Sequence, residues 1–249
     1  SSAREREMIQ LFGKLISKDP NFYRTVAGIA IPIGLQGLIT TGINMMDTIM
    51  IGTLGETELS AVSLANQFIN IYQILCMGIG MGASVLVSRY YGMKDKVSMQ
   101  KTVAIMTRFC LVIASVFALL TCLFPGAIMR IYTVEDVIIQ NGERYLSWSV
   151  VTYFLLGLSL TGTIVLRNVG QVKIPLFTSI GAFFVNILAN YMFIFGKLGA
   201  PAMGVAGAAI GTLIARIFEF SVIDGFLWFR EKSIEFRLKN FFMPVGELW

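Results

Sequence analysis

The chain has 249 residues, of which 55% are hydrophobic and 14% are charged, with a formal net charge of +5. A soluble domain averages about 25% charged residues, so a water-soluble globular protein is excluded and lipid is the expected solvent for this apolar surface. A nucleic-acid-binding protein is excluded as well, because the basic residues are spread over several loops without a single patch or stripe.

Residues 1–24 are predicted to form a cytoplasmic lead-in to the membrane. Within them, residues 4–18 place apolar side chains at helical spacing and charges on the other face, which predicts an amphipathic helix on the membrane surface. The apolar members are Met8, Leu11, Phe12, Leu15 and Ile16. The turn signal at residues 19–21 should end this helix. No apolar segment followed by a small-residue cleavage site precedes it, so no signal peptide is expected.

The rest of the chain predicts an all-α, polytopic membrane protein with a six-helix lobe over residues 25–229. Each predicted span has the roughly 20 apolar residues that a crossing needs. The spans are residues 25–52, 59–88, 102–124, 146–166, 174–196 and 205–229. Pro32 and several neighbouring glycines make the first span the best candidate for a kink. Residues 230–249 are predicted to be a cytoplasmic linker.

The distribution of Lys and Arg predicts the orientation. Most basic residues lie in the N-terminal tail, after the second and fourth spans, and after the sixth. On the other side only Arg130, Arg144 and Lys197 remain. By the positive-inside rule both termini face the cytoplasm. The signal-free, all-membrane design fits the inner membrane of a bacterium.

Cysteine and histidine usage narrows the chemistry. Cys76, Cys110 and Cys122 all fall in apolar stretches without a C-x-x-C pair, which predicts reduced, packed side chains and no zinc site. The chain has no histidine, so a proton relay would have to use carboxylates.

Five charged residues fall inside the predicted spans. For each, a purely structural reason for its charge is weighed against a role in binding an ion or substrate. Arg108 is expected to extend its long stem to the headgroups, and Asp224, near the cytoplasmic end of its span, to be hydrated. Arg216 and Glu219 are three residues apart and close enough to pair; Glu219 is kept as a secondary cation-binding candidate. Asp47 has no basic residue nearby in the sequence.

Asp47 is the strongest functional candidate. A lone charge at the centre of a span costs roughly 2.5–3.5 kcal/mol, which a chain tolerates when the group has a partner or a task. Asn186 and Asn190, on one face of the fifth span, and Thr212, in the small-residue stretch 204–212, should lie at a similar depth in the outer half. These oxygen donors, with Asn44 as a secondary candidate, predict a site for H⁺ or for Na⁺, the latter at Asp47, Asn186 and Asn190. An alternative places Asp47 in water at the outer end of its span.

Several segments resemble the multidrug and toxic compound extrusion (MATE) transporters. Pro32 followed by NMMDTIMIGTLG at residues 44–55 resembles the first-helix motif. LSAVSLANQ at 59–67 resembles the start of the second helix, and GIGMG at 78–82 with VSRYYG at 87–92 its end. LRNVGQVKIP at 166–175 resembles the connection between the fourth and fifth helices, and Asn186 with Asn190 a polar pair in the fifth.

The resemblance implies a secondary antiporter that exports organic, often cationic or amphipathic drugs in exchange for H⁺ or Na⁺, without a cofactor. It implies that Asp47 is the ion-binding acid of the first helix, and that Asn186, Asn190 and, approximately, Thr212 contribute to its site. Some relatives carry Asp where this chain has Asn190, which weakens the case for a full Na⁺ site.

The family has two six-helix lobes, and this chain matches one. Residues 236–244 resemble the inter-lobe linker, so the chain is expected to be a truncated N-terminal half that works with a missing C-terminal lobe or with a second copy of itself. The alternatives are a non-transporting, truncated or structural membrane subunit and, less favoured, a lipid-linked sugar flippase. An intramembrane enzyme is not expected, because no H-E-x-x-H motif, paired aspartates or Ser–Lys dyad occurs at mid-bilayer.

Overall fold

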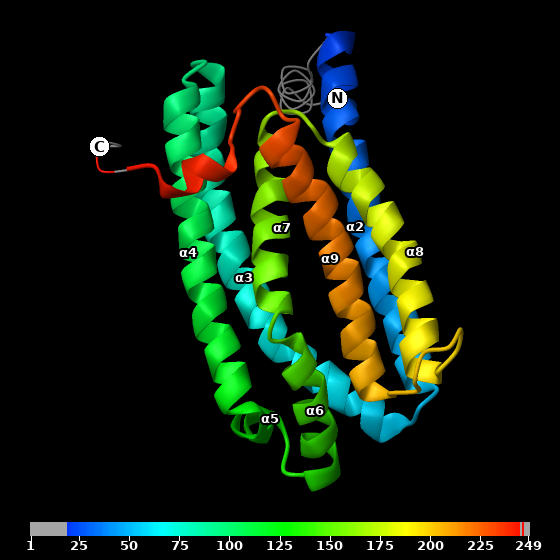
Figure 1. The fold of residues 1–249 in the computed structure, drawn as a ribbon. Helices are drawn as coiled ribbons and strands as arrows, with labels where there is room; N and C mark the ends of the chain where they lie inside the picture. The colour runs from blue at the N-terminus through cyan, green and yellow to red at the C-terminus, as the bar shows by residue number, and fades with distance from the viewer. Residues whose placement is uncertain (1–18, 245, 247–249) are drawn as a thin grey trace, which may run out of the picture.

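The computed structural model describes residues 19–244 and 246, which form helices and loops without a strand (Figure 1). Five helices are long and apolar enough to cross a membrane, and the bent pair α6 and α7 makes a sixth. They are α2 (Pro20–Gly52), α3 (Glu56–Gly92), α4 (Lys96–Leu123), α6 (Asp136–Ser149), α7 (Thr152–Asn168), α8 (Lys173–Phe195) and α9 (Val205–Phe229). The short helix α5 (Pro125–Tyr132) precedes α6, and the 3₁₀ helix η1 (Leu238–Phe242) follows α9. The predicted all-α polytopic fold is confirmed, whereas the amphipathic helix predicted over residues 4–18 lies outside the described residues.

Helix α2 begins earlier than the predicted first span. Asp19 is its N-cap, accepting a hydrogen bond of 2.9 Å from the backbone N–H of Asn21, and Pro20 occupies the first turn, where its missing N–H costs nothing. The helix continues unbroken through Pro32, whose ring leaves the Gly28 carbonyl without its usual partner. Most of α2 is exposed, and it packs mainly along α8 (Figure 1).

The predicted fourth span, residues 146–166, is wrong as a single helix, because α6 and α7 meet at an angle of 57° after Ser149. Neither proline nor glycine lies at the break. Instead the hydroxyl of Ser149 hydrogen-bonds back to the Tyr145 carbonyl at 2.8 Å, a contact that often bends helices. From α3, the Tyr72 hydroxyl donates to the Tyr153 carbonyl at 2.6 Å, so a side chain enters the first turn of α7.

Apolar packing holds the bundle at three levels. One cluster joins α3, α5 and α6 to the ends of α2, α8 and α9 near Ile51. A second fills the space between α3, α4 and α7 around Tyr72 and includes the buried Cys76 and Cys110. Cys122 is exposed, so its predicted packing is wrong. The third cluster joins the opposite ends of α3, α4, α7 and α9.

After α9 the chain folds back onto α4, and we call residues 230–244 the C-terminal strap. Ile234 and Phe236 are buried in the third cluster. The Lys96 ammonium donates to Glu235 at 2.7 Å, which lowers the pKa of that carboxyl. The Gln100 amide donates to the Ile234 carbonyl at 2.8 Å.

Arg108 secures the far end of the strap. Its Nε donates to the Phe241 carbonyl and its Nη2 to the Met243 carbonyl, each at 2.7 Å. The sequence predicted that this side chain extends toward the headgroups; in the structure, two strap carbonyls bind its guanidinium.

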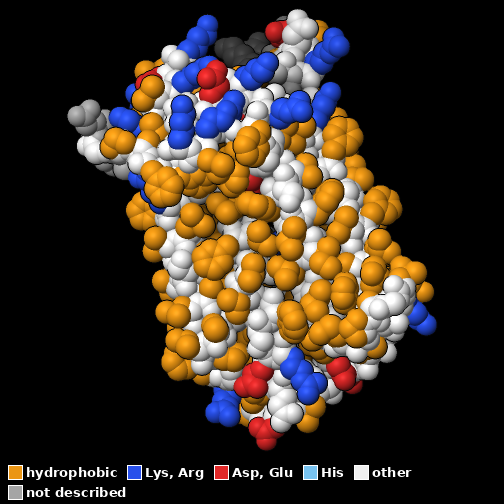
Figure 2. All heavy atoms as spheres, viewed as in Figure 1, with side chains coloured by type: hydrophobic (Ala, Val, Ile, Leu, Met, Phe, Trp, Pro, Cys, Tyr) orange, Lys and Arg blue, Asp and Glu red, His pale blue; other side chains and the backbone are white. Residues whose placement is uncertain are grey.

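Charged and apolar side chains occupy different zones of the surface. Hydrophobic side chains cover the middle of the face in Figure 2, and Lys and Arg gather at one end. At that end lie the α3–α4 and α7–α8 connections and the strap (Figure 1). This clustering is the pattern from which the cytoplasmic orientation was predicted.

Candidate functional site

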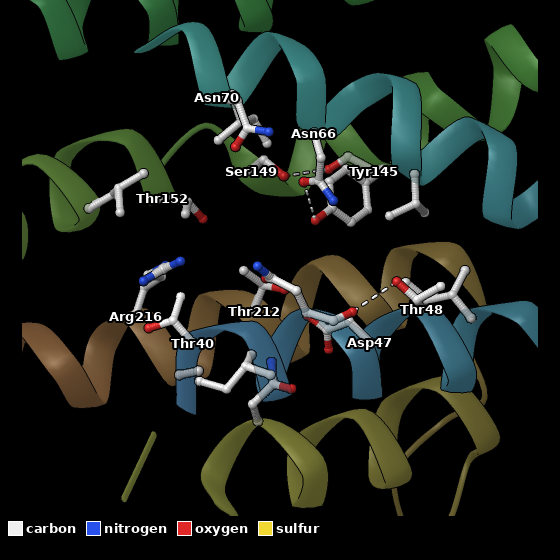
Figure 3. A pocket seen from close by; sticks show the side chains of 18 of the residues that line it. Thr40, Asp47, Thr48, Asn66, Asn70, Tyr145, Ser149, Thr152, Thr212 and Arg216 are labelled. Carbon is white, nitrogen blue, oxygen red and sulfur yellow. Dashed lines mark hydrogen bonds between the residues drawn. The ribbon is translucent and has the colours of Figure 1, made fainter. Parts of the chain in front are cut away.

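A cavity of about 340 Å³ lies inside the lobe, at the end away from the strap. Side chains of α2, α3, α6, α7, α8 and α9 line it, and many are polar although the helices are largely apolar (Figure 3). All the predicted site residues except Asn190 are among its lining: Asp47, Asn186, Thr212, Asn44 and Glu219. Asn190 lies directly behind the lining, hydrogen-bonded to Asp47.

Asp47, Asn190 and Asn186 form one hydrogen-bonded chain between α2 and α8. The Asn190 amide nitrogen donates to Oδ1 of Asp47 at 2.5 Å and to Oδ1 of Asn186 at 3.2 Å. Both asparagines are buried, and Asp47 is half-buried at the cavity wall. A buried amide thus holds the carboxylate of Asp47 at the cavity wall.

The orientation of Asn190 differs from the expected set of oxygen donors. We expected both amide carbonyls to face the carboxylate, but Asn190 presents its NH₂ group to Asp47. Its Oδ1 is buried and has no hydrogen-bond partner among the described residues. The reason is chemical: an ionised carboxylate accepts hydrogen bonds only, so it draws the donor end of the amide.

Close approach of α9 to α8 shapes this part of the site. A Cβ atom at Gly211 would collide with Oδ1 of Asn190, and one at Gly207 would collide with the Phe193 backbone. The small-residue stretch predicted to allow close packing does so here. It brings Thr212 to the same cavity as Asp47.

Sequence reasoning missed a polar stripe on α3. Ser63, Asn66, Asn70 and Gln73 follow one another at intervals of three and four residues, and all line the cavity. Asn66 and Asn70 lie across it from Asp47 (Figure 3). The Tyr145 hydroxyl donates to Oδ1 of Asn66 at 3.0 Å. This helical spacing of polar residues within an apolar span was the available signal.

Arg216 and Glu219 form the predicted ion pair, at 2.6 Å, with side chains that are 30% and 18% exposed. Both also line the cavity, so Glu219 faces the same space as Asp47. Each residue of the pair is therefore bonded to the other and also faces the cavity that holds Asp47.

The sequence suggested that Asp224 is hydrated, and this is wrong. The residue is buried, with only 2% of its surface exposed. Gly162 of α7 lies against its carboxyl group, because a residue without a side chain lets α9 pack closely there. Its Oδ2 has no hydrogen-bond partner within residues 19–244.

The polar side chains around Asp47 are a carboxylate, amides and hydroxyls, whose oxygens are the ligand types of hard cations. The Oδ1 of Asn190 is buried against Gly211, behind the lining, so it would join this set only if the amide turned. Among the described residues no three His, Cys, Asp or Glu side chains gather into a metal cluster.

A family model described as MatE matches residues 32–192. The chain is 27% identical over 241 residues to a probable multidrug resistance protein NorM of Thermotoga maritima, covering 94% of this chain and 50% of that protein. It is 26% identical over 188 residues to the uncharacterized transporter YisQ of Bacillus subtilis, covering 75% of this chain and 41% of that protein. The chain thus spans about half the length of the curated relatives that it matches.

Solved structures share the fold. A MOP superfamily transporter from Pyrococcus furiosus superposes with a TM-score of 0.80 at 22% identity, covering 90% of this chain and 49% of that chain. An outward-facing multidrug resistance MATE family transporter gives 0.77 at 23% identity over 90% of this chain and 49% of that one. An inward-facing structure gives 0.73 at 22% identity over 90% and 50%.

Proposed function

The chain belongs to the MatE family, and from this premise we propose that it is the N-terminal lobe of a secondary antiporter that exports organic, often cationic or amphipathic drugs in exchange for H⁺ or Na⁺. Its relatives are named as transporters and multidrug resistance proteins. The observation that carries the proposal is the Asp47 carboxylate at a polar cavity wall, held by Asn190.

We propose that ion binding is sensed through the Asn190 amide. While Asp47 is ionised, it accepts the hydrogen bond from the Asn190 NH₂ group. A protonated Asp47 becomes a donor, and the buried Oδ1 of Asn190, which lacks a partner in the described structure, becomes the favourable acceptor. Na⁺ likewise prefers that oxygen. Either ion therefore favours a turned amide and a changed contact between α2 and α8.

The change at the Asp47–Asn190 contact is transmitted to the rest of the lobe through α2. This helix is largely exposed, carries Pro32 at a weakened hydrogen-bond position, and packs mainly on α8. A ligand shifts a conformational equilibrium only by its different affinity for the two states. Here the difference in ion affinity between the two states comes from the Asp47–Asn190 contact, and α2 is the element that moves.

Partners and location follow the same proposal. The lobe would sit in a bacterial inner membrane with its Lys- and Arg-rich end in the cytoplasm, and would work with a C-terminal lobe or with a second copy of this chain. We infer that it has no enzymatic activity, since its relatives are transporters.

An efflux assay tests the proposal. Cells that lack their own drug exporters would produce the chain alone, or together with a C-terminal lobe, and efflux of a fluorescent organic cation would be followed under an H⁺ or Na⁺ gradient. Ion-driven efflux that disappears in Asp47→Asn supports the proposal. Absence of efflux with either arrangement would favour the structural-subunit alternative.

A further inference from the structure

A second cavity, of about 400 Å³, lies next to the first. The two cavities share a wall of five residues: Thr40, Gln73, Leu156, Arg216 and Glu219. The Arg216–Glu219 ion pair therefore stands at the boundary between the cavities and faces both.

The second cavity extends toward the strap end of the lobe. At its far side the Arg167 Nη2 donates to Oε1 of Gln36 at 2.6 Å, and the Nε of Arg167 has no partner among the described residues. At about 1.5 Å per residue, the helix from Asp47 to Gln36 covers about 16 Å. The paired cavities thus follow a large part of the bilayer depth.

Polar residues on α2 line this path from one cavity to the next. Asn44 and Asp47 line the first cavity, Thr40 lines both, and Gln36 lines the second. They recur at intervals of three or four residues, so they share one face of the helix. A hydrated cation would find oxygen donors along this face.

The charges that face the path are unevenly placed. Asp47 comes from α2, Arg216 and Glu219 from α9, and Arg167 from α7; the Tyr145 phenol comes from α6. The lining residues contributed by α3 and α8 are uncharged. Arg216 is paired with Glu219 at the shared wall, which leaves Asp47 as the carboxylate of the first cavity that has no ion-pair partner among the described residues.

We propose that Glu219 is a second binding site for the coupling cation, between the Asp47 site and the Arg167 end of the path, and that Arg216 is its exchangeable counter-charge. When the cation occupies Asp47, Arg216 pairs with Glu219, as observed. When the cation moves to Glu219, Arg216 is released from the pair and compensates Asp47, which lines the same cavity. Arg167 repels the cation at the far end, so Glu219 is the last carboxylate before release.

This inference rests on the proposed cation coupling and adds a second site to it. Its test uses the purified 249-residue chain and measures how the unfolding midpoint rises with Na⁺ at fixed pH, and with H⁺ between about pH 5 and pH 8. A ligand that binds the folded state raises stability according to its concentration relative to its dissociation constant. If one cation can bind at either of two sites, the unfolding midpoint should still rise with cation concentration when only one of the sites is intact.

The variants are Asp47→Asn, Glu219→Gln and both together. Glu219→Gln leaves the half-buried Arg216 without its ion-pair partner, which itself destabilises the fold. The neutral double variant Arg216→Gln/Glu219→Gln therefore accompanies it. Glu135→Gln, at an exposed acid outside both cavities, is the matched control and should respond like the wild type.

Each single carboxylate variant should need a higher cation concentration for the half-maximal response, and the Asp47→Asn/Glu219→Gln variant should lose the response. The inference is overturned if Asp47→Asn alone abolishes the response while both Glu219 variants respond like the wild type; the Asp47 proposal then stands. If Asp47→Asn has no effect and the Glu219 variants abolish the response, the Asp47 proposal fails. A wild-type chain that responds to neither Na⁺ nor H⁺ overturns both.

Discussion

The amide nitrogen of Asn190 lies 2.5 Å from Oδ1 of Asp47, which joins α8 to α2 within the bundle. The same nitrogen reaches Asn186, one turn away. One amide thus determines which atoms the carboxylate meets, and the first predictions concern this contact.

Asp47→Asn should abolish ion-dependent efflux while the chain still inserts and folds. The amide keeps the size of the side chain and removes its charge and its proton-binding oxygen. Efflux of a fluorescent cation and helix content by circular dichroism measure the two effects. Asp136→Asn, at an exposed position on α6, should leave efflux unchanged; equal loss in both variants would contradict a special role for Asp47.

Asn190→Ala should lower the free energy of unfolding by about 1.5–3 kcal/mol, the range for a hydrogen bond to a charged group. It removes both the donor to Asp47 and the partner of Asn186. Asn186→Ala should cost less, because Asp47 keeps its contact with Asn190. Denaturant unfolding in detergent would compare them, and a larger loss for Asn186→Ala would speak against the observed donor arrangement.

Gly211→Ala should destabilise the lobe by about 1–3 kcal/mol through overpacking, because the added methyl group would collide with Asn190. It should also weaken the response to Na⁺ or H⁺. Gly225→Ala is the matched control on α9: nothing lies within 4 Å of its added Cβ, and the better helix former should stabilise by up to about 1 kcal/mol. Thermal unfolding with and without Na⁺ distinguishes them.

Asp224→Leu, similar in shape, should raise the free energy of unfolding by about 1–3 kcal/mol, since it removes an unpartnered buried polar group, which carries a cost of that order. Thermal unfolding of the purified chain measures the change. A lower midpoint in the variant would show that Asp224 has a favourable partner.

Docking of the strap should weaken in acid. Because Lys96 lowers the pKa of Glu235 in the folded chain, the contribution of this ion pair is fully present above the ordinary carboxyl pKa. It is lost as pH falls through the lowered pKa, which lies below the ordinary pKa of a glutamic acid. A nitroxide probe at position 239 should become more mobile in this range. In Glu235→Gln the mobility should be higher at neutral pH and should not depend on this titration.

Much of the bundle could be predicted from the sequence, because long apolar stretches and turn signals mark the ends of helices. α9 covers the residues of the predicted sixth span, and α8 nearly those of the fifth. The proximity of Asp47 and Asn190 could be predicted from their depth in the membrane. Once the direction of each helix is known, the position of a residue along it gives that depth.

The rest depends on which helix faces which. The bend between α6 and α7 has no proline or glycine to announce it and follows from side chains such as Tyr72 that arrive from elsewhere. Asp224 is buried because Gly162 lies opposite it, and Arg108 binds carbonyls more than 130 residues away in the chain. Such contacts between distant residues leave no local pattern.

The strap ties the end of α9 to α4 across the bundle, at the end opposite the Asp47 cavity. Its bonds to Lys96, Gln100 and Arg108 resist separation of these two helices there. Any splaying of the α2, α8 and α9 group from α3 and α4 must then pivot about that tethered end, with the largest opening beside Asp47. The strap therefore determines at which end of the lobe the helices can separate, and that end is the one that holds the Asp47 cavity.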